Sequence, residues 1–254
     1  MSSKSMKRVK LYWYNATPNL GDALSPYIVS RLFSLKTDWV DPEEKCKKYF
    51  ATGSIINKAD DLTEVWGSGL LSLSFKPAGK PTVHAVRGPL TRSRMNSLGI
   101  KCPNAMGDPS LLMPQVYNPT VDKKFKVGII PHYVDKNHRA IESVRSETLV
   151  IDVQNENVEQ TVDQILSCEL IISSSLHGLI IADAYGIPNV WIRLSNKIVG
   201  GDFKFNDYFL SVQRFSRKPL PVGEKLNFKA IAAKYKDEKP VFDSEPLLES
   251  NPFS

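Results

Sequence analysis

Short apolar runs alternate with amphipathic stretches along the chain, and Gly, Pro or polar residues separate them. Residues 9–15 (VKLYWYN) are rich in β-branched and aromatic side chains, which predicts a strand. Residues 21–35 carry apolar side chains at helical spacing, so a helix follows this strand and completes a βα unit. The same pattern predicts strands over residues 48–52, 64–66 and 82–86, and a helix over residues 89–98 that begins with Pro and stops at Gly99.

A polar, aperiodic stretch at residues 118–124 is the expected domain boundary, because a second series of alternating elements begins after it. This series predicts strands over residues 126–130, 148–153, 169–173 and 189–194, and helices over residues 137–146, 158–167 and 176–185. Strands that alternate with helices form parallel sheets covered on both faces. The expected fold class is therefore α/β, with Rossmann-like domains at residues 1–118 and 119–215.

The remaining residues, 216–254, are richer in Pro, Lys and Glu and contain one expected helix near residues 228–235. We expect this C-terminal tail to pack back on the N-terminal domain.

Composition narrows the class of protein. Of the 254 residues, 42% are hydrophobic and 24% are charged, as in globular proteins. No apolar run approaches the roughly 18 residues that span a bilayer, and no secretory signal is visible, so a cytoplasmic protein is expected. The three cysteines are far apart and no metal-ligand spacing occurs, which predicts neither disulfides nor a metal site. The net charge of +6 allows anion binding, but basic and acidic residues are interspersed and nothing else suggests nucleic acid.

The strongest candidate site is a polar elbow between the apolar strand 169–173 and the apolar helix after it. Ligands of open α/β sheets bind at the carboxyl ends of strands, where this elbow lies. Hydroxyls and free backbone N–H groups at the helix start would accept an anion, and His177 could donate a proton or pair with a phosphate. The candidate anion-binding residues of the elbow are Ser174, Ser175, Leu176, His177 and Gly178.

Other strand ends supply weaker candidates. Asp22, after the first strand, is either a helix N-cap or a catalytic or substrate-binding group. Arg87 combines a guanidinium with a helix N-terminus, which favours anion binding over a structural salt bridge. His132 follows the strand 126–130 and is a second-rank candidate, whereas Asp108 is expected only to hydrogen-bond its own turn. The aromatic segment 203–209 is expected to be a loop with buried aromatics, with a membrane or sugar contact as the alternative.

Taken in order, four motifs resemble the polysaccharide pyruvyl transferase family. They are NLGD at residues 19–22, RGPLTR at 87–92, GDPSLL at 107–112 and SSSLHGLIIADAYGIP at 173–188. The resemblance implies a fold similar to the glycosyltransferase B type, with two Rossmann-like domains facing a cleft. It also implies transfer of a pyruvyl group from phosphoenolpyruvate to a sugar of an exopolysaccharide or cell-surface glycan as a cyclic ketal, with no further cofactor.

This chemistry requires a clamp for phosphate and carboxylate, an acid near the phosphate and a base near the sugar. We expect Arg87 and the elbow to bind the donor, His177 to be the acid or to pair with the phosphate, and Asp22 to be the base. The expected acceptor-binding residues are Asn19, Asp22, His132, Lys204 and Asp207.

One departure from the family pattern concerns Ser175. Many members resemble S-R-L-H-G at the elbow and have an arginine at the position where this chain has Ser175. Either another cation, such as Arg92, Lys197 or Lys204, compensates for the missing arginine, or the donor is held more weakly. A lipid-linked acceptor and peripheral association with the inner face of a membrane stay open. The main alternative function is a nucleotide-sugar glycosyltransferase of the same architecture, and a non-enzymatic scaffold is a third.

Overall fold

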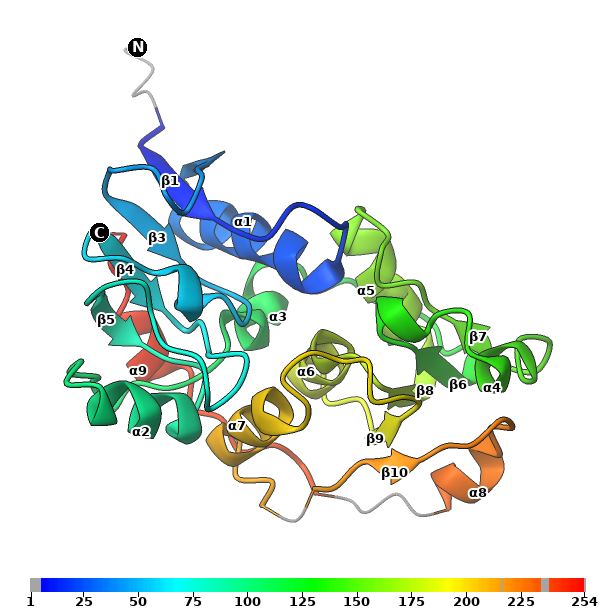
Figure 1. Cartoon of the computed structure of the whole chain (residues 1–254). Helices are drawn as coiled ribbons and strands as arrows, with labels where there is room; N and C mark the ends of the chain where they lie inside the picture. The colour runs from blue at the N-terminus through cyan, green and yellow to red at the C-terminus, as the bar shows by residue number, and fades with distance from the viewer. Residues whose placement is uncertain (1–5, 216, 234–237, 254) are drawn as a thin grey trace, which may run out of the picture.

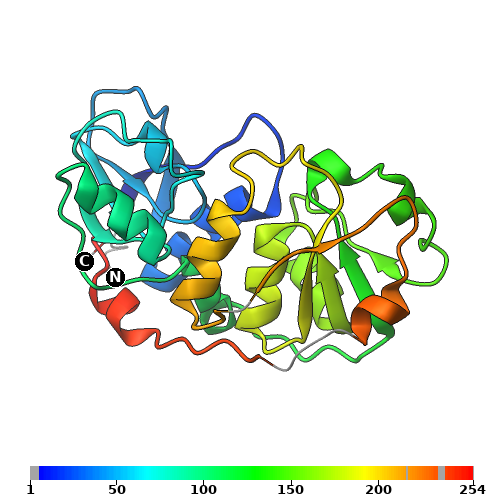
Figure 2. The same cartoon turned by 60° about the horizontal axis from the view of Figure 1, so that its bottom comes forward.

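The computed structural model describes residues 6–215, 217–233 and 238–253, and its strands form two parallel five-stranded sheets. The two sheets lie side by side, each with its own helices (Figure 1; Figure 2). This arrangement confirms the predicted α/β class and is consistent with two Rossmann-like domains. Similarity to the glycosyltransferase B type stays a prediction.

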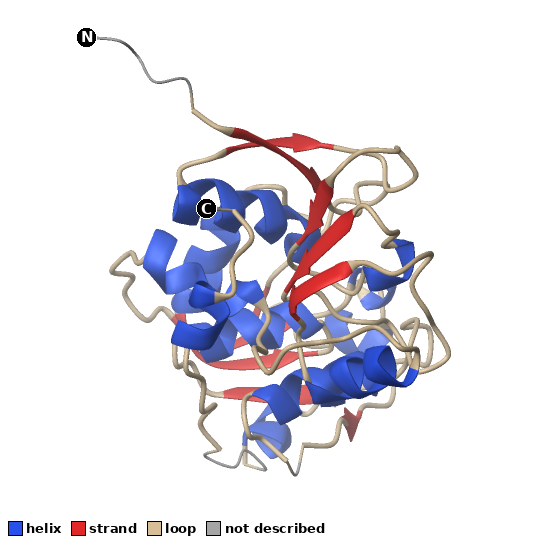
Figure 3. Cartoon of the chain, turned by 90° about the vertical axis from the view of Figure 1, so that its left-hand side faces the viewer, coloured by secondary structure: helices blue, strands red, loops and turns tan. Residues whose placement is uncertain are grey.

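The first sheet has the order β2-β1-β3-β4-β5. Figure 3 shows its strands and the helices beside them. Its strands and helices are β1 (Arg8–Tyr12), α1 (Leu20–Phe33), β2 (Lys36–Trp39), β3 (Lys48–Phe50), β4 (Thr63–Trp66), β5 (Thr82–Ala85) and α2 (Pro89–Ser97). All were predicted within a few residues except β2, a four-residue strand with no buried residue and therefore no apolar pattern.

The second sheet has the order β10-β9-β8-β6-β7 and follows the short helix α3 (Met113–Val116). Its elements are β6 (Phe125–Ile130), α4 (Arg139–Glu142), β7 (Leu149–Val150), α5 (Val158–Leu166), β8 (Cys168–Ser173), α6 (Leu176–Ala184), β9 (Asn189–Arg193), α7 (Phe203–Ser211), β10 (Leu220–Pro221) and α8 (Phe228–Ala232). Helix α4 and strand β7 are shorter than predicted. Helix α7 corrects the expected loop: Phe205, Tyr208 and Phe209 are buried on its inner face at helical spacing.

Two helices cross from one sheet's region to the core of the other. Leu20, Leu24 and Ile28 of α1 lie in one apolar cluster with residues of β6, α5 and β8. Helix α7 lies against α2 (Figure 1). These crossings bring the β1–α1 loop and the start of α7 to the carboxyl ends of the second sheet, where ligands of such sheets bind.

The C-terminal tail returns to the first sheet through α9 (Glu245–Glu249). The Trp66 indole Nε1–H donates to the Leu247 carbonyl oxygen at 2.8 Å, and both residues are fully buried. Phe253 packs edge-on against Trp66, with ring centroids 5.6 Å apart. The tail therefore covers part of the core of the N-terminal domain.

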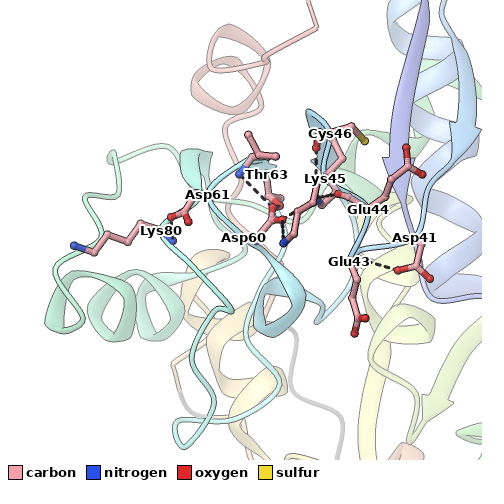
Figure 4. A network of polar contacts seen from close by, with 11 residues as sticks. Asp41, Glu43, Glu44, Lys45, Cys46, Asp60, Asp61, Thr63 and Lys80 are labelled. Carbon is pink, nitrogen blue, oxygen red and sulfur yellow. Dashed lines mark hydrogen bonds and ion pairs between the residues drawn. The ribbon is translucent and has the colours of Figure 1, made fainter.

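A polar network ties together the loops at the amino ends of β3 and β4 (Figure 4). The Thr63 hydroxyl donates to Asp60 at 2.8 Å, and the Lys80 backbone N–H donates to Asp61 at 2.7 Å. Lys48, at the start of β3, is fully buried and donates to Asp60 at 3.0 Å. This network lies at the amino ends of the strands, and the candidate site lies at their carboxyl ends. The network therefore supports the fold and not the candidate site.

Candidate functional site

A cavity of about 380 Å³ lies where the two sheets' loops meet, and we call it the lysine cavity after Lys58, Lys197 and Lys204 in its wall. Its volume falls within the range of about 300–1,000 Å³ that is usual for small-molecule sites. The elbow at the start of α6, the β1–α1 loop and the start of α7 all contribute to it. Seven predicted site residues line this cavity: Asn19, Asp22, His132, Ser175, Leu176, His177 and Lys204.

The elbow is rigid and its helix start is open. The Ser173 hydroxyl accepts a hydrogen bond from the Ser175 N–H at 2.9 Å. The same hydroxyl lies within hydrogen-bond distance of two backbone carbonyl oxygens, to which it can donate, and these contacts fix the turn. Ser175 is the N-cap residue, and its side chain makes no capping hydrogen bond. The first N–H groups of α6 therefore receive no cap from Ser175, and Ser175, Leu176 and His177 line the cavity beside them; an uncapped helix start of this kind binds anions.

Two predicted elbow residues build the turn instead of lining the cavity. Ser174 is fully buried, and its hydroxyl accepts the His132 N–H at 2.9 Å. A Cβ at Gly178 would lie 2.7 Å from the Ser173 hydroxyl, so only glycine lets α6 approach β8 this closely. The structure corrects their expected contact with the donor: they position their neighbours.

His177 lies between the two halves of the molecule. Its Nε2 is buried without a hydrogen bond and lies 3.7 Å from a carboxylate oxygen of Asp108. Its Nδ1 lies toward Gly21 of α1, where a Cβ would come within 2.0 Å. The absent side chain of Gly21 thus makes room for the imidazole.

Asp108 does more than the predicted turn. It accepts the Ser110 N–H at 3.0 Å, as expected, and its other oxygen faces His177. Burial alone would raise the pKa of Asp108, but His177 and the Ser110 N–H outweigh it, and the pKa lies below its ordinary value. Asp108 is therefore a buried carboxylate whose charge faces His177. Sequence reasoning missed this pair, and the GDPSLL motif was the only signal for it.

Asp22 faces the cavity from the first turn of α1. Asn19 is the N-cap residue of that helix, and its amide donates to Asp22 at 3.0 Å, so Asp22 is not the cap. Burial raises the pKa of Asp22 to about 6, although His177, Asn19 and Lys204 lower it. A carboxylate with this pKa exchanges a proton near neutral pH, as a general base must.

Lys204 and His132 face Asp22 and His177 across the cavity. Burial, with Arg87 nearby, lowers the pKa of Lys204 to about 8, and its ammonium forms no ion pair with any described residue. Burial, with Lys204 and His177, lowers the pKa of His132 to about 3, so this imidazole is neutral. Its Nδ1 accepts the Val134 N–H at 3.3 Å, which leaves Nε2 as a donor.

Arg87 and Asp207 form a buried pair outside the lysine cavity. Both side chains are fully buried, with the guanidinium 3.0 Å from the carboxylate. Arg87 also donates to the Ser54 hydroxyl at 2.6 Å and to the Leu70 carbonyl at 2.8 Å, while Asp207 accepts the Thr91 N–H. The structure thus corrects two expected placements, because neither group has a free face for donor or acceptor. The salt bridge between Arg87, just before α2, and Asp207 of α7 accounts for the burial of both side chains.

Of the cations considered in place of an elbow arginine, Lys197 and Lys204 line the cavity. Arg92 instead donates to the Pro103 carbonyl at 2.9 Å, outside it. Lys58 lines the cavity as well and was not predicted, because it lies in a three-residue 3-10 helix, Ile56–Lys58, that carries no motif. Among the described residues, no group of three or more His, Cys, Asp or Glu could hold a metal ion, and no helix is long and apolar enough to cross a membrane.

Fold and site together define a two-domain α/β protein with a cationic cavity that also holds a carboxylate and a histidine. The chain belongs to the polysaccharide pyruvyl transferase family, whose sequence profile matches residues 78–196. It is 32% identical over 216 residues to the uncharacterized protein L143 of Acanthamoeba polyphaga mimivirus, covering 80% of this chain and 74% of that protein.

It is also 26% identical over 209 residues to the succinoglycan biosynthesis protein ExoV of Rhizobium meliloti (strain 1021), covering 78% of this chain and 62% of ExoV. A crystal structure of a functionally uncharacterized protein from Klebsiella pneumoniae subsp. pneumoniae NTUH-K2044 superposes with a TM-score of 0.51 at 13% identity. The superposition covers 86% of this chain and 93% of that one, and it shows similarity of fold alone.

Proposed function

We propose that this protein transfers the pyruvyl group of phosphoenolpyruvate to two hydroxyls of a saccharide, forming a cyclic ketal and releasing phosphate. Family membership supports pyruvyl transfer in general. The observation that carries the finer proposal is that one cavity combines anion-binding groups with Asp22 and His177. The first set suits the donor's phosphate and carboxylate, and the second suits the proton transfers of ketal formation.

The donor would lie between α6 and the lysines. The open N-terminus of α6 supplies backbone N–H groups and the positive end of the helix dipole. Lys204, unpaired in the described structure, and Lys197 supply positive charge on the opposite side. These two lysines take the place of the arginine that Ser175 replaces, as point charges instead of a bidentate clamp.

The proton transfers follow from the positions of His177 and Asp22. Protonated His177 gives its proton to the methylene carbon of phosphoenolpyruvate, which becomes a methyl group and leaves a cation-like centre at the neighbouring carbon. The first sugar hydroxyl attacks this centre and loses its proton to Asp22. The second hydroxyl then displaces phosphate, which takes up the proton of that hydroxyl, and the proton on Asp22 returns through solvent to His177.

Asp108 acts through His177 and is a positioning residue. A carboxylate that faces one ring nitrogen holds the imidazole's orientation and stabilises its protonated form. The distance of 3.7 Å is longer than a hydrogen bond, as is common in structures without substrate.

The proposal is tested by phosphate release from phosphoenolpyruvate in the presence of a glycan extract as acceptor. His177→Gln should reduce the rate by about 10²–10⁴-fold, the usual contribution of a general acid. His84→Gln is the matched control, since His84 contacts Glu64 on the first sheet and lies outside the cavity. Equal rates for both variants and the wild type would contradict the assignment of His177.

A second measurement separates pyruvyl transfer from nucleotide-sugar glycosyl transfer. A ligand that binds only the folded state raises the melting temperature as its concentration exceeds its Kd. Phosphoenolpyruvate should stabilise the protein, and Lys204→Met should weaken this effect. Stabilisation by nucleoside diphosphates alone would replace the pyruvyl proposal with the glycosyltransferase alternative.

A further inference from the structure

A second cavity, of about 450 Å³, adjoins the lysine cavity along the outer face of α1. We call it the aromatic cavity, because Trp13, Tyr14 and Tyr27 line it. The two cavities share Tyr14, Asn19 and Asp22, so the proposed base stands on the boundary between them.

The electrostatic character of the two cavities differs. The lysine cavity is lined by three lysines, whose positive charges favour an anion. Within the part of the chain that the structure describes, the aromatic cavity is lined by no lysine or arginine, and its only charged residues are Asp22 and Glu156. An anionic ligand would be repelled there, whereas a neutral one would not.

The remaining lining of the aromatic cavity fits a carbohydrate. Sugar rings present apolar C–H faces, which pack on aromatic rings, and hydroxyl edges, which need hydrogen-bond partners. Trp13 is half-buried and Tyr14 is 42% exposed, so both rings offer free surface. Asn15, Thr17 and Thr37 supply the polar groups between them.

We propose that the aromatic cavity binds the penultimate and further sugars of a neutral oligosaccharide acceptor, whose terminal sugar reaches Asp22 from that side. This inference rests on the proposed function, since it divides one cleft between an anionic donor and a neutral glycan. The acceptor is then a chain of two or more sugars and not a free monosaccharide. The two substrates enter from opposite sides of α1's first turn.

The test measures binding in the absence of phosphoenolpyruvate, with the full chain on an array of neutral glycans of one to six sugars. Ligands found on the array are then titrated, and their terminal monosaccharides are titrated beside them. A trisaccharide should bind at least tenfold more tightly than its terminal monosaccharide.

Three variants locate the gain. Trp13→Leu removes the aromatic ring, and Thr17→Trp fills the cavity from a partly exposed loop position without removing a core contact. Both should abolish the tenfold gain. Trp39→Leu is the control, because the Trp39 indole donates to the Trp13 carbonyl at 3.0 Å but lies outside both cavities' linings. It should keep the gain.

Four results would overturn the inference: no neutral glycan bound, monosaccharides bound as tightly as trisaccharides, a gain that survives Thr17→Trp, or a gain lost equally in Trp39→Leu. Because phosphoenolpyruvate is absent from this assay, its outcome is independent of phosphate release. Glycan binding without phosphate release would refute the proposed reaction, and the converse would refute only the aromatic cavity's role.

Discussion

Replacing Asp22 by Asn should raise the stability of the protein at pH 8 while it removes phosphate release. The pKa of Asp22 rises from 3.8 to about 6 on folding, because burial penalises its charge. Below pH 3.8, the pKa in the unfolded state, this carboxyl makes its full contribution to the stability of the folded state. That contribution is lost as the pH rises through about 6, the pKa in the folded state. At about 1.4 kcal/mol per pKa unit, ionised Asp22 destabilises the folded state by about 3 kcal/mol at pH 8 and by about 1 kcal/mol at pH 4.5.

Asp22→Asn removes this penalty and keeps an oxygen that can accept the hydrogen bond from Asn19. Allowing about 1 kcal/mol for the weakened interaction, we expect a net gain of about 2 kcal/mol at pH 8 and about none at pH 4.5. Urea unfolding at both pH values measures it. Asp38→Asn is the control, because Asp38 forms a partly exposed salt bridge with Arg8, and the stability of this variant should stay within about 1 kcal/mol of the wild type. A variant that is less stable at pH 8, or whose gain does not depend on pH, would refute the burial of a functional charge.

Three further substitutions test the geometry around the cavity. Gly21→Ala should leave the fold intact but reduce phosphate release about 100-fold, because its Cβ would displace the His177 ring; Gly223→Ala, with nothing within 4 Å, should be silent. Lys204→Met should raise the KM for phosphoenolpyruvate more than it lowers kcat. In the wild type, the KM for phosphoenolpyruvate should increase when the pH is raised above about 8, because Lys204 then loses its proton. Arg87→Met should destabilise the protein by about 3–5 kcal/mol in urea unfolding, since Asp207 stays buried without its partner; a variant of normal stability that fails to bind phosphoenolpyruvate would restore Arg87 as a donor ligand.

The alternation of strands and helices was predictable because each element leaves a local apolar period. The strand β8 and the helix α6 each contain a continuous apolar run, at residues 170–172 and 179–182, and the polar elbow between these runs was visible for that reason. The strand β2 was not, because none of its residues is buried. Helix α7 was missed because its aromatic side chains are compatible with a buried loop, a membrane contact or a sugar contact. Only its packing against α2, which the sequence does not show, selects a buried helix.

The candidate site was predictable only where residue type and strand-end position coincide, as for Asp22 and His177. The partner of each charged group depends on which helices cross between the domains, and no local pattern in the sequence encodes that. Arg87 illustrates the limit: a guanidinium beside a helix start suits an anion, and the structure supplies an internal one, Asp207, from α7. The same crossing brings Lys204, one helical turn before Asp207, to face Asp22.

The proposed role of Lys204 in place of an elbow arginine has a physical consequence. Lys204, whose pKa is about 8, has its ammonium 5.6 Å from the centroid of the Phe205 ring and forms no ion pair with a described carboxylate, so its charge is available to a ligand. The buried pair of Arg87 and Asp207 keeps the start of α7 in position, and the positive field of Arg87 lowers the pKa of Lys204 further. An anionic donor that enters the cavity would reverse this shift, so donor binding should be coupled to proton uptake by Lys204. The proposed effect of Arg87 on the donor is therefore indirect, through Lys204, which it helps to position.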